Sequence, residues 1–169
     1  MGIRVELVPS DRQWSVMYEV EERRIRDTLG NEARLIEHVG STSVPGLAAK
    51  PILDVVLAVT DSSAEAEYVP QLEVAGYEMK LREPDWYEHR LLTRAEPKVN
   101  LHVFSEGCEE IERMIVFRDR LRESESDRAR YSRLKSDLAS VEWASIQDYA
   151  DAKSAVVEDI IGRARHDRS

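Results

Sequence analysis

The sequence contains a single cysteine, Cys108, among its 169 residues. One cysteine excludes an internal disulfide framework and any zinc site built from several cysteines. No apolar run approaches the roughly 18 residues that a membrane-spanning helix needs, and the N-terminus lacks the long apolar core of a secretory signal. These absences predict a cytoplasmic protein that does not associate with membranes.

Basic residues are also in deficit, because 24 Lys and Arg stand against 33 Asp and Glu, for a net charge of -9. The overall field therefore repels polyanions and argues against general nucleic-acid binding. Arginines cluster at "EERRIRD" and at "FRDRLRESESDRARYSRLK", where they alternate with acidic residues at helical spacing. Such spacing is typical of solvated helix faces with ion pairs, although a local basic site stays open.

The length and composition predict one domain over residues 1–169, with no repeat, linker or low-complexity segment. The sequence is 42% hydrophobic and 34% charged, which is ordinary for a soluble globular protein. A chain of about this size buries roughly 70% of its unfolded-state surface, so it can form a core without disulfides.

The hydrophobic pattern predicts an α/β (α+β) fold with a helical C-terminal third. A helix capped by Asp11 should end near Gly30, and strands are expected at residues 34–39 and 51–59. A helix is expected over residues 62–75, with Pro70 kinking or restarting it. Residues 86–94 and 98–104 should pair as antiparallel strands across Glu96-Pro97, and three helices are expected from about Glu109, the last starting near Ser145.

The segment "HVGSTSVPGLAAKPILDVVLAV" places four small residues, Gly40 to Ser43, directly after a predicted strand. Pro45 and Gly46 make a tight turn in any reading, but they do not explain the hydroxyl-rich stretch before it. Its backbone N–H groups and hydroxyls suit close approach to a phosphate, and Lys50 can add a cation. No Walker or dinucleotide pattern is present, and a solvent-facing lysine remains the alternative for Lys50.

Asp54 is the only acidic residue in the apolar strand that follows. Alternation places it on one face with Ile52, Val56 and Ala58, where an unpaired charge costs several kcal/mol. Its partner is either an internal Lys or Arg or a Mg²⁺ ion shared with substrate phosphates. In "KVNLHVF", His102 can stand beside Asp54 on a neighbouring strand, or it can be an ordinary hydrogen-bonded core histidine.

These motifs, together with "EHRLLTR", "VNLHVF", "FRDRLR" and "YSRLKSDLA", resemble the GrpB family over nearly the whole chain. The resemblance implies a nucleotidyltransferase-like mixed sheet flanked by helices, a phosphate loop at Gly40-Ser41 and a metal-binding Asp54. The GrpB family also resembles a domain attached to some dephospho-coenzyme A kinases, for which an accessory folding role has been proposed. No kinase P-loop occurs here.

The chain departs from the catalytic nucleotidyltransferase pattern, in which the aspartate strand carries two carboxylates separated by one residue. The position two after Asp54 is Val56, and the later strand offers His102 where an acid is expected. One Asp with one His is a poor set of ligands for two Mg²⁺ ions. The sequence therefore predicts a modified metal site with fewer ligands than the catalytic pattern.

Three functions follow as hypotheses: a Mg-dependent nucleotidyltransferase-like enzyme, a non-catalytic nucleotide or coenzyme A binding module, and an accessory module for protein folding or interaction. The ligand in the first two is a nucleotide or another phosphorylated small molecule. The expected catalytic residues are Asp54 and His102. The residues expected at phosphates or the nucleotide are Gly40, Ser41, Thr42, Lys50, His89, Arg90, Arg118 and Lys135. Of these, Arg118 and Lys135, like Arg122 and Tyr131, match family positions but also suit helix-surface pairs or core packing.

Overall fold

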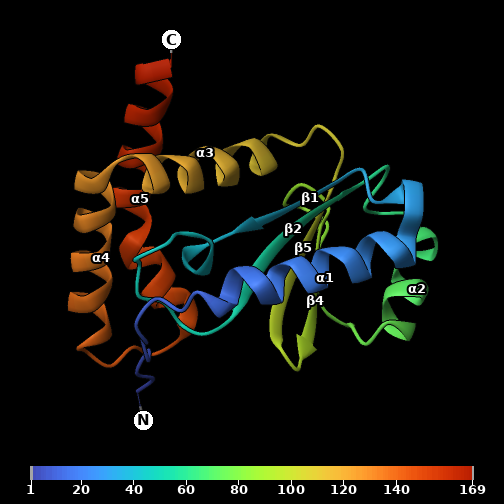
Figure 1. Cartoon of the computed structure of the whole chain (residues 1–169), viewed down its shortest axis with the longest axis horizontal. Helices are drawn as coiled ribbons and strands as arrows, with labels where there is room; N and C mark the ends of the chain where they lie inside the picture. Colours follow the sequence, from blue (N-terminus) through green and yellow to red (C-terminus); the bar gives the residue numbers. More distant parts are fainter. Residues whose placement is uncertain (1, 169) are drawn as a thin grey trace.

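A mixed sheet forms the centre of the protein in the computed structural model, which describes residues 2–168 (Figure 1). Within this range five strands lie in the order β1-β2-β5-β4-β3. The β2–β5 pair is parallel and the other neighbours are antiparallel. The strands are β1 (Leu35–Val39), β2 (Leu53–Val59), β3 (Glu78–Glu83), β4 (His89–Ala95) and β5 (Lys98–Ser105).

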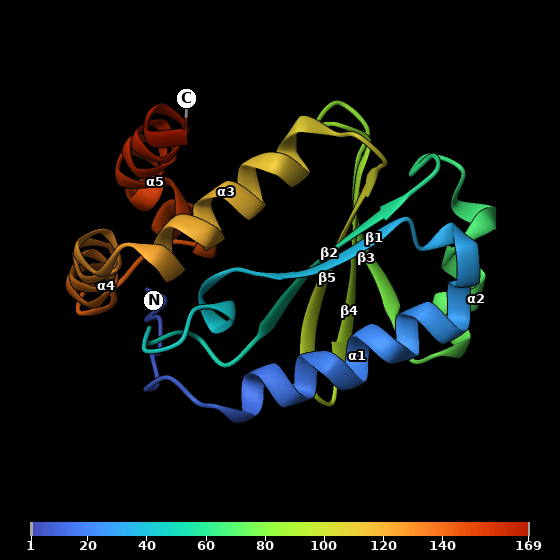
Figure 2. The same cartoon turned by 45° about the horizontal axis from the view of Figure 1, so that its top comes forward.

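Helices cover both faces of this sheet, and three of them form a separate group beside it (Figure 2). Helix α1 (Gln13–Leu29) and the short α2 (Val69–Val74) lie on one face, and α3 (Glu109–Glu123) crosses the other. Helices α4 (Glu125–Ala139) and α5 (Ile146–Arg168) pack with α3 at the end of the sheet where the β1–β2 loop lies. The predicted mixed sheet flanked by helices, with a helical C-terminal third, is confirmed. Among residues 2–168, no helix has the length and apolar character needed to cross a membrane.

The core has a large cluster on the α1 side of the sheet and a smaller one under α3. Trp14 and Ile25 of α1 pack on Leu53, Val55 and other residues of the first cluster. Val56, Ala58 and Phe104 pack with Ile111 in the second. Strand β2 is therefore buried on both faces, as its continuous apolar run predicts.

Two features of the sheet differ from the expectation. Strand β3 was missed because it is an edge strand of mostly exposed, polar residues, and so it lacks an apolar alternation. Strand β4 starts at His89, three residues later than expected, because residues 86–88 belong to the turn that follows β3. Tyr87 and Glu88 in this turn have φ values of 55° and 50°, which a strand does not allow.

The expected helix over residues 62–75 is also shorter than predicted. A 3₁₀ turn, η3, covers Glu65–Glu67, and α2 begins at Val69 with Pro70 in its first turn. Proline fits the first turn, where a backbone N–H has no helical partner, but not a helix interior. Pro70 therefore restarts the helix, the second of the two outcomes expected for it.

The start of α1 and the start of α5 follow their predicted capping residues. Asp11 accepts a hydrogen bond from the Gln13 backbone N–H at 2.8 Å, and Ser145 accepts one from the Asp148 backbone N–H at 3.1 Å. Side-chain oxygens at these positions satisfy backbone donors that the helix leaves free.

Candidate functional site

The β1–β2 loop starts with a glycine that no other residue can replace without strain. Gly40 has φ 72°, and a Cβ atom built on it would lie 2.6 Å from Asp54 Oδ2. The bare backbone thus lets the loop pass directly over the start of β2. One 3₁₀ turn, η2 (Ser41–Ser43), follows at once, so the small residues of the motif lie beside Asp54.

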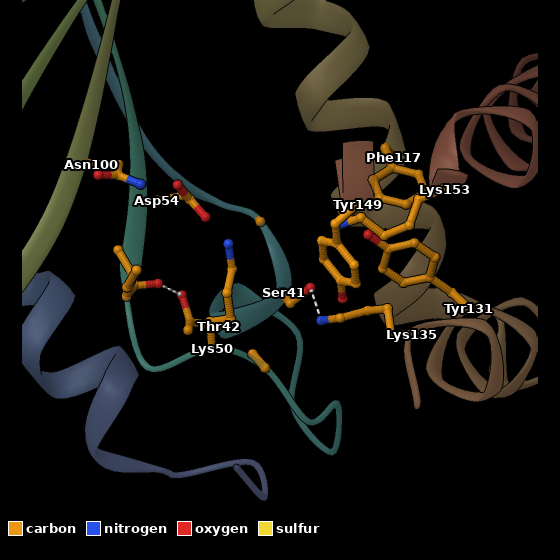
Figure 3. A pocket seen from close by; sticks show the side chains of 13 residues that line it. Ser41, Thr42, Lys50, Asp54, Asn100, Phe117, Tyr131, Lys135, Tyr149 and Lys153 are labelled. Carbon is orange, nitrogen blue, oxygen red and sulfur yellow. Dashed lines mark hydrogen bonds between the residues drawn. The ribbon is translucent and has the colours of Figure 1, made fainter. Parts of the chain in front are cut away.

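The three hydroxyls of η2 have different surroundings. Thr42 Oγ1 lies 2.9 Å from His38 Nε2 and donates to the Ile52 carbonyl at 3.3 Å. Ser43 Oγ donates to the Gly40 carbonyl. Ser41 instead faces away from the sheet toward the helices, where it accepts a hydrogen bond from Lys135 Nζ at 2.6 Å (Figure 3). Ser41 is therefore the hydroxyl of this turn that the helical side of the cleft engages.

A cleft separates this loop and the start of β2 from helices α3, α4 and α5. It consists of a cavity of about 180 Å³ and an adjoining cavity of about 440 Å³, which share Gly40, Asp54, Phe117, Tyr131 and Lys153 in their walls. The smaller cavity is also lined by residues of the loop, of β5 and of the helices (Figure 3), namely Ser41, Thr42, Ala49, Lys50, Ile52, Asn100, Lys135 and Tyr149.

Three lysines from three different elements meet at the smaller cavity: Lys50 before β2, Lys135 on α4 and Lys153 on α5. Lys135 is 4% exposed, and its ammonium also donates to the Ala48 carbonyl at 2.9 Å. Burial, together with the charges of Lys153 and Lys50, lowers the pKa of Lys135 to about 7. Burial and Lys50 likewise lower the pKa of Lys153 to about 8.

Negative charge at this cleft is scarce. Among the described residues that line its two cavities, Asp54 is the only carboxylate. The hydroxyl of Tyr149 is buried and has no hydrogen-bond partner among residues 2–168. An unsatisfied buried polar group costs roughly 1–3 kcal/mol, which an incoming hydrogen-bonding group would recover. The lining of the cleft therefore combines an excess of basic side chains with a hydroxyl group that has no partner among the described residues.

Asp54 is the first member of a chain of hydrogen-bonded groups along the α3 face of the sheet. Its Oδ1 lies 3.3 Å from His102 Nε2, His102 Nδ1 lies 3.1 Å from His89 Nε2, and His89 Nδ1 lies 2.8 Å from Glu83 Oε1. Trp86 and Phe104 enclose the His89 ring, whose pKa is lowered by burial.

The two ends of this series of hydrogen bonds, Asp54 and Glu83, differ in position. Asp54 opens into the cleft, and Glu83 lies at the edge strand with a side chain that is 40% exposed. These hydrogen bonds therefore connect the cleft to a carboxylate at the outer edge of the sheet.

The family model described as "GrpB protein" matches residues 4–163. The chain belongs to the GrpB family.

Two relatives of this GrpB chain each match almost its entire length. A UPF0157 protein of Halalkalibacterium halodurans is 53% identical over 95% of this chain and 82% of its own. A dephospho-CoA kinase of Mycolicibacterium paratuberculosis is 27% identical over 95% of this chain and 46% of its own.

Two of the solved structures similar to this chain differ widely in how well they match it. A crystal structure of conserved protein GrpB from Enterococcus faecalis has a TM-score of 0.82 and 30% identity, and covers 94% of this chain and 96% of that one. A structure of Cid1 with the UTP analog UMPNPP has a TM-score of 0.43 and 12% identity over 77% of this chain and 42% of that one, too low to carry an argument.

Most residues expected at the site of this GrpB chain do meet at the cleft. Gly40, Ser41, Thr42, Lys50, Asp54 and Lys135 line the smaller cavity, and His102 lines the larger one. His89 contacts the His102 ring nitrogen that does not face Asp54, and it lines neither cavity. His102 stands beside Asp54 on the neighbouring strand, because Asp54 lies opposite Asn100 on β5 and His102, two residues later, points to the same face.

Two expected phosphate ligands lie elsewhere. Arg90 lines neither cavity, and its guanidinium pairs with Glu65 at 2.7 Å because alternation along β4 turns it away from His89. Arg118 is 8% exposed and donates to Glu37 and to the His38 carbonyl, both at 3.0 Å. The structure places both arginines in internal ion pairs.

Two residues that complete the cleft were missed from the sequence, Tyr149 and Lys153. They are four residues apart on α5, and Lys153 Nζ lies 4.5 Å from the centre of the Tyr149 ring. The spacing is a usable signal, since residues at i and i+4 share a helix face. What it lacks is any indication that this face turns toward the β1–β2 loop.

A magnesium ion does not fit the protein's own donor set. Among residues 2–168 there is no group of three or more His, Cys, Asp or Glu side chains that could hold a metal. Mg²⁺ prefers six oxygen ligands, whereas Asp54 has a histidine as its neighbour. A magnesium ion at Asp54 would have to take its other ligands from water and from the phosphates of a bound molecule.

Proposed function

We propose that this GrpB protein binds a phosphorylated small molecule of the nucleotide or coenzyme A class, with its phosphates in the lysine-lined cavity. One observation carries the proposal: Lys50, Lys135 and Lys153 meet at a cavity of about 180 Å³ that has Asp54 as its carboxylate. Gathering three ammonium groups costs free energy, and a bound polyanion reverses that cost.

The size and chemistry of the cleft support a ligand of this class. The smaller cavity suits phosphate groups, and the adjoining one of about 440 Å³ offers Val39, Met114, Phe117 and Val157 to a less polar part. Together the two volumes fall within the range of about 300–1,000 Å³ typical of small-molecule sites. The protein as a whole carries a net charge of -9, so the attraction is local and does not extend to nucleic acids.

Transfer of a nucleotidyl group is the less supported part of the prediction. Two-metal displacement needs carboxylates that bridge the ions, and Val56 stands where the second is expected. Without a metal cage, the cleft supplies lysines for charge stabilisation, and Asp54 with His102 as acid or base groups. The predictions of a magnesium requirement and of a cytoplasmic location stay predictions.

The alternative is a non-catalytic module with the same ligand class. It is favoured by the similarity to a protein named dephospho-CoA kinase, because this chain corresponds to only 46% of that protein's length. A segment of that kind can serve a neighbouring catalytic domain without a reaction of its own. The two functions share the binding step and differ in turnover.

Isothermal titration of the protein with ATP, with coenzyme A and with inorganic pyrophosphate, each with and without Mg²⁺, tests the binding step. Lys153→Met should weaken binding by roughly 10–100-fold, the effect of losing a hydrogen bond to a charged group. Lys98→Met, which removes an exposed lysine at the start of β5, is the matched control and should bind as the unmodified protein does. Absence of binding at millimolar concentrations, or equal effects of the two variants, would refute the proposal.

Asp54→Asn separates the two ways in which Asp54 can act. If the carboxylate holds a magnesium ion shared with the ligand, the variant loses the part of the affinity that Mg²⁺ adds. If it only repels phosphates, the variant binds more tightly, and equally with and without Mg²⁺.

A further inference from the structure

Ser41 and Lys135 form a close pair whose arrangement exceeds what phosphate binding requires. Lys135 Nζ lies 2.6 Å from Ser41 Oγ and 2.9 Å from the Ala48 carbonyl oxygen. Lys135 reaches this position from the C-terminal half of α4, and it is 4% exposed. A lysine that only attracts phosphates would gain from an open, flexible position, but this one is fixed on a single hydroxyl.

The surroundings of Lys135 favour its neutral form. The titratable and charged groups that face it are Lys50 before β2, Lys153 on α5 and Asp54 on β2, with the tyrosines of α4 and α5 nearby. Burial and the two other lysines lower the pKa of Lys135 to about 7, and Asp54 opposes them. A neutral amine has two N–H bonds and one lone pair, so it can donate to Ala48 and accept the Ser41 proton.

We infer that Ser41 is a nucleophile and that Lys135 is the general base that activates it, for attack on the phosphorus of a phosphoanhydride bound in the cleft. In this step the Ser41 Oγ–H bond breaks and the proton moves to Lys135 Nζ. A bond forms between Oγ and phosphorus, and the anhydride P–O bond breaks with its electron pair leaving on the departing phosphate. The product is a phosphorylated Ser41.

The cleft holds groups that suit this step. Lys50 and Lys153 stand at the same cavity and can stabilise charge on the transferred phosphoryl group. The other two hydroxyls of the turn are unsuited, since Thr42 is held between His38 and the Ile52 carbonyl, and Ser43 donates to Gly40. Ser41 is thus singled out by its contact with Lys135.

The inference relies on the proposed function for its phosphoryl donor, but its first test does not need that ligand. The full chain is treated with phenylmethylsulfonyl fluoride between pH 6 and pH 9. The rate of modification is followed by intact mass, and the modified residue is located by peptide mapping. Sulfur then replaces phosphorus, fluoride leaves, and the proton again moves to Lys135.

We expect modification at Ser41 with a rate that rises with pH around the Lys135 pKa of about 7. Lys135→Met should slow it at least tenfold, since a positioned general base contributes roughly 10²–10⁴-fold. Lys135→Arg should slow it similarly, because arginine keeps the charge but cannot take up a proton. Lys153→Met should move the midpoint to higher pH by removing a neighbouring charge, and the exposed control Lys98→Met should change nothing.

Several outcomes would overturn the inference. They are absence of modification at Ser41, a rate independent of pH, and a rate unchanged in both Lys135 variants. If Lys135→Met does not fold, Lys135→Arg and the pH profile of the unmodified protein still decide the question. Modification without binding of ATP or pyrophosphate would keep the activated serine and refute the proposed ligand. Binding of ATP or pyrophosphate without modification of Ser41 would keep the proposed ligand and refute the activated serine.

The transfer step has its own readout. After incubation with ATP, intact mass and peptide mapping should find one phosphoryl group on Ser41, and none in Ser41→Ala or Lys135→Arg. If ATP binds and Ser41 reacts with the sulfonyl fluoride, but no phosphoryl group reaches Ser41, the transfer step is refuted.

Discussion

Replacing Lys135 with methionine should stabilise the protein at low pH and lose this benefit as the pH rises. The pKa of Lys135 is lowered from 10.5 to about 7 in the folded protein. Between these values the unfolded chain binds more protons than the folded one, so the stability of the unmodified protein rises with pH. Below pH 7 both states are protonated, and the folded state then carries the full cost of a buried ammonium.

The magnitude follows from the size of this pKa shift. At about 1.36 kcal/mol per pKa unit, the cost at low pH is about 5 kcal/mol, and roughly 2.6 kcal/mol of it is recovered between pH 6 and pH 9. Methionine removes this cost but also removes the hydrogen bonds to Ser41 and Ala48. These are worth about 1 kcal/mol each. The variant should therefore be more stable by about 2–3 kcal/mol at pH 6 and about equal at pH 9.

Urea unfolding of both proteins at pH 6, 7.5 and 9 measures this difference, with Lys98→Met as the exposed control. The slope against pH is the decisive quantity, since lost packing adds a constant offset at every pH. A Lys135→Met protein whose stability differs from the unmodified protein by the same amount at pH 6 and pH 9 would refute a lowered lysine pKa. It would also remove the support that the pKa gives to the serine–lysine pair.

Three further substitutions test the architecture around the cleft. Gly40→Ala should lower the free energy of unfolding in urea by about 1–3 kcal/mol and weaken ligand binding, because φ is 72° and the new Cβ would lie 2.6 Å from Asp54 Oδ2. Unchanged stability would contradict the close approach of the loop to Asp54. Arg90→Ala should cost about 2–4 kcal/mol, as a buried partner of Glu65 is lost, and leave the affinity of the folded protein for ATP unchanged; a loss of affinity would return Arg90 to the site. Val56→Asp should lower the melting temperature strongly rather than create a metal site, because Val56 is 0% exposed within the α3-side core; a stable variant with new Mg²⁺ affinity would show that the position faces the cleft.

The sequence predicts the local elements of this fold well where the physical signal is local. The buried run of β2 and the capping residues Asp11 and Ser145 lie where their chemistry requires. Strand β3 escapes such reasoning because pairing with β4, and not its own side chains, makes it a strand. Pro70 shows why helix boundaries are harder to predict: a proline marks a break in a helical pattern, but it does not show on which side of the break the helix lies.

The residues of the candidate site also differ in whether a local sequence pattern reveals them. Ser41 and Asp54 are found from the sequence because one loop and one strand bring them together within 14 residues of each other along the chain. Lys153 is not found, because the loop and strand residues it meets at the cavity, Lys50 and Asp54, lie about 100 residues before it in the sequence. Arg118 illustrates the opposite error, as its position on α3 suits the cleft in a pattern, but its guanidinium turns to Glu37 and His38.

The lysine cluster at the smaller cavity is a feature that stability alone would not produce. Lys50, Lys135 and Lys153 reach the smaller cavity from a loop and two helices, with the pKa values of the last two lowered to about 7 and about 8. Each of these lysines would be better solvated on the surface, and apolar residues in their place would pack without electrostatic cost. Asp54 is a single carboxylate, so it cannot offset the positive charge of three lysines. The positive charge of the cleft is therefore a cost that the proposed anionic ligand would offset, and this makes the lysine-lined cavity the first place to test for binding.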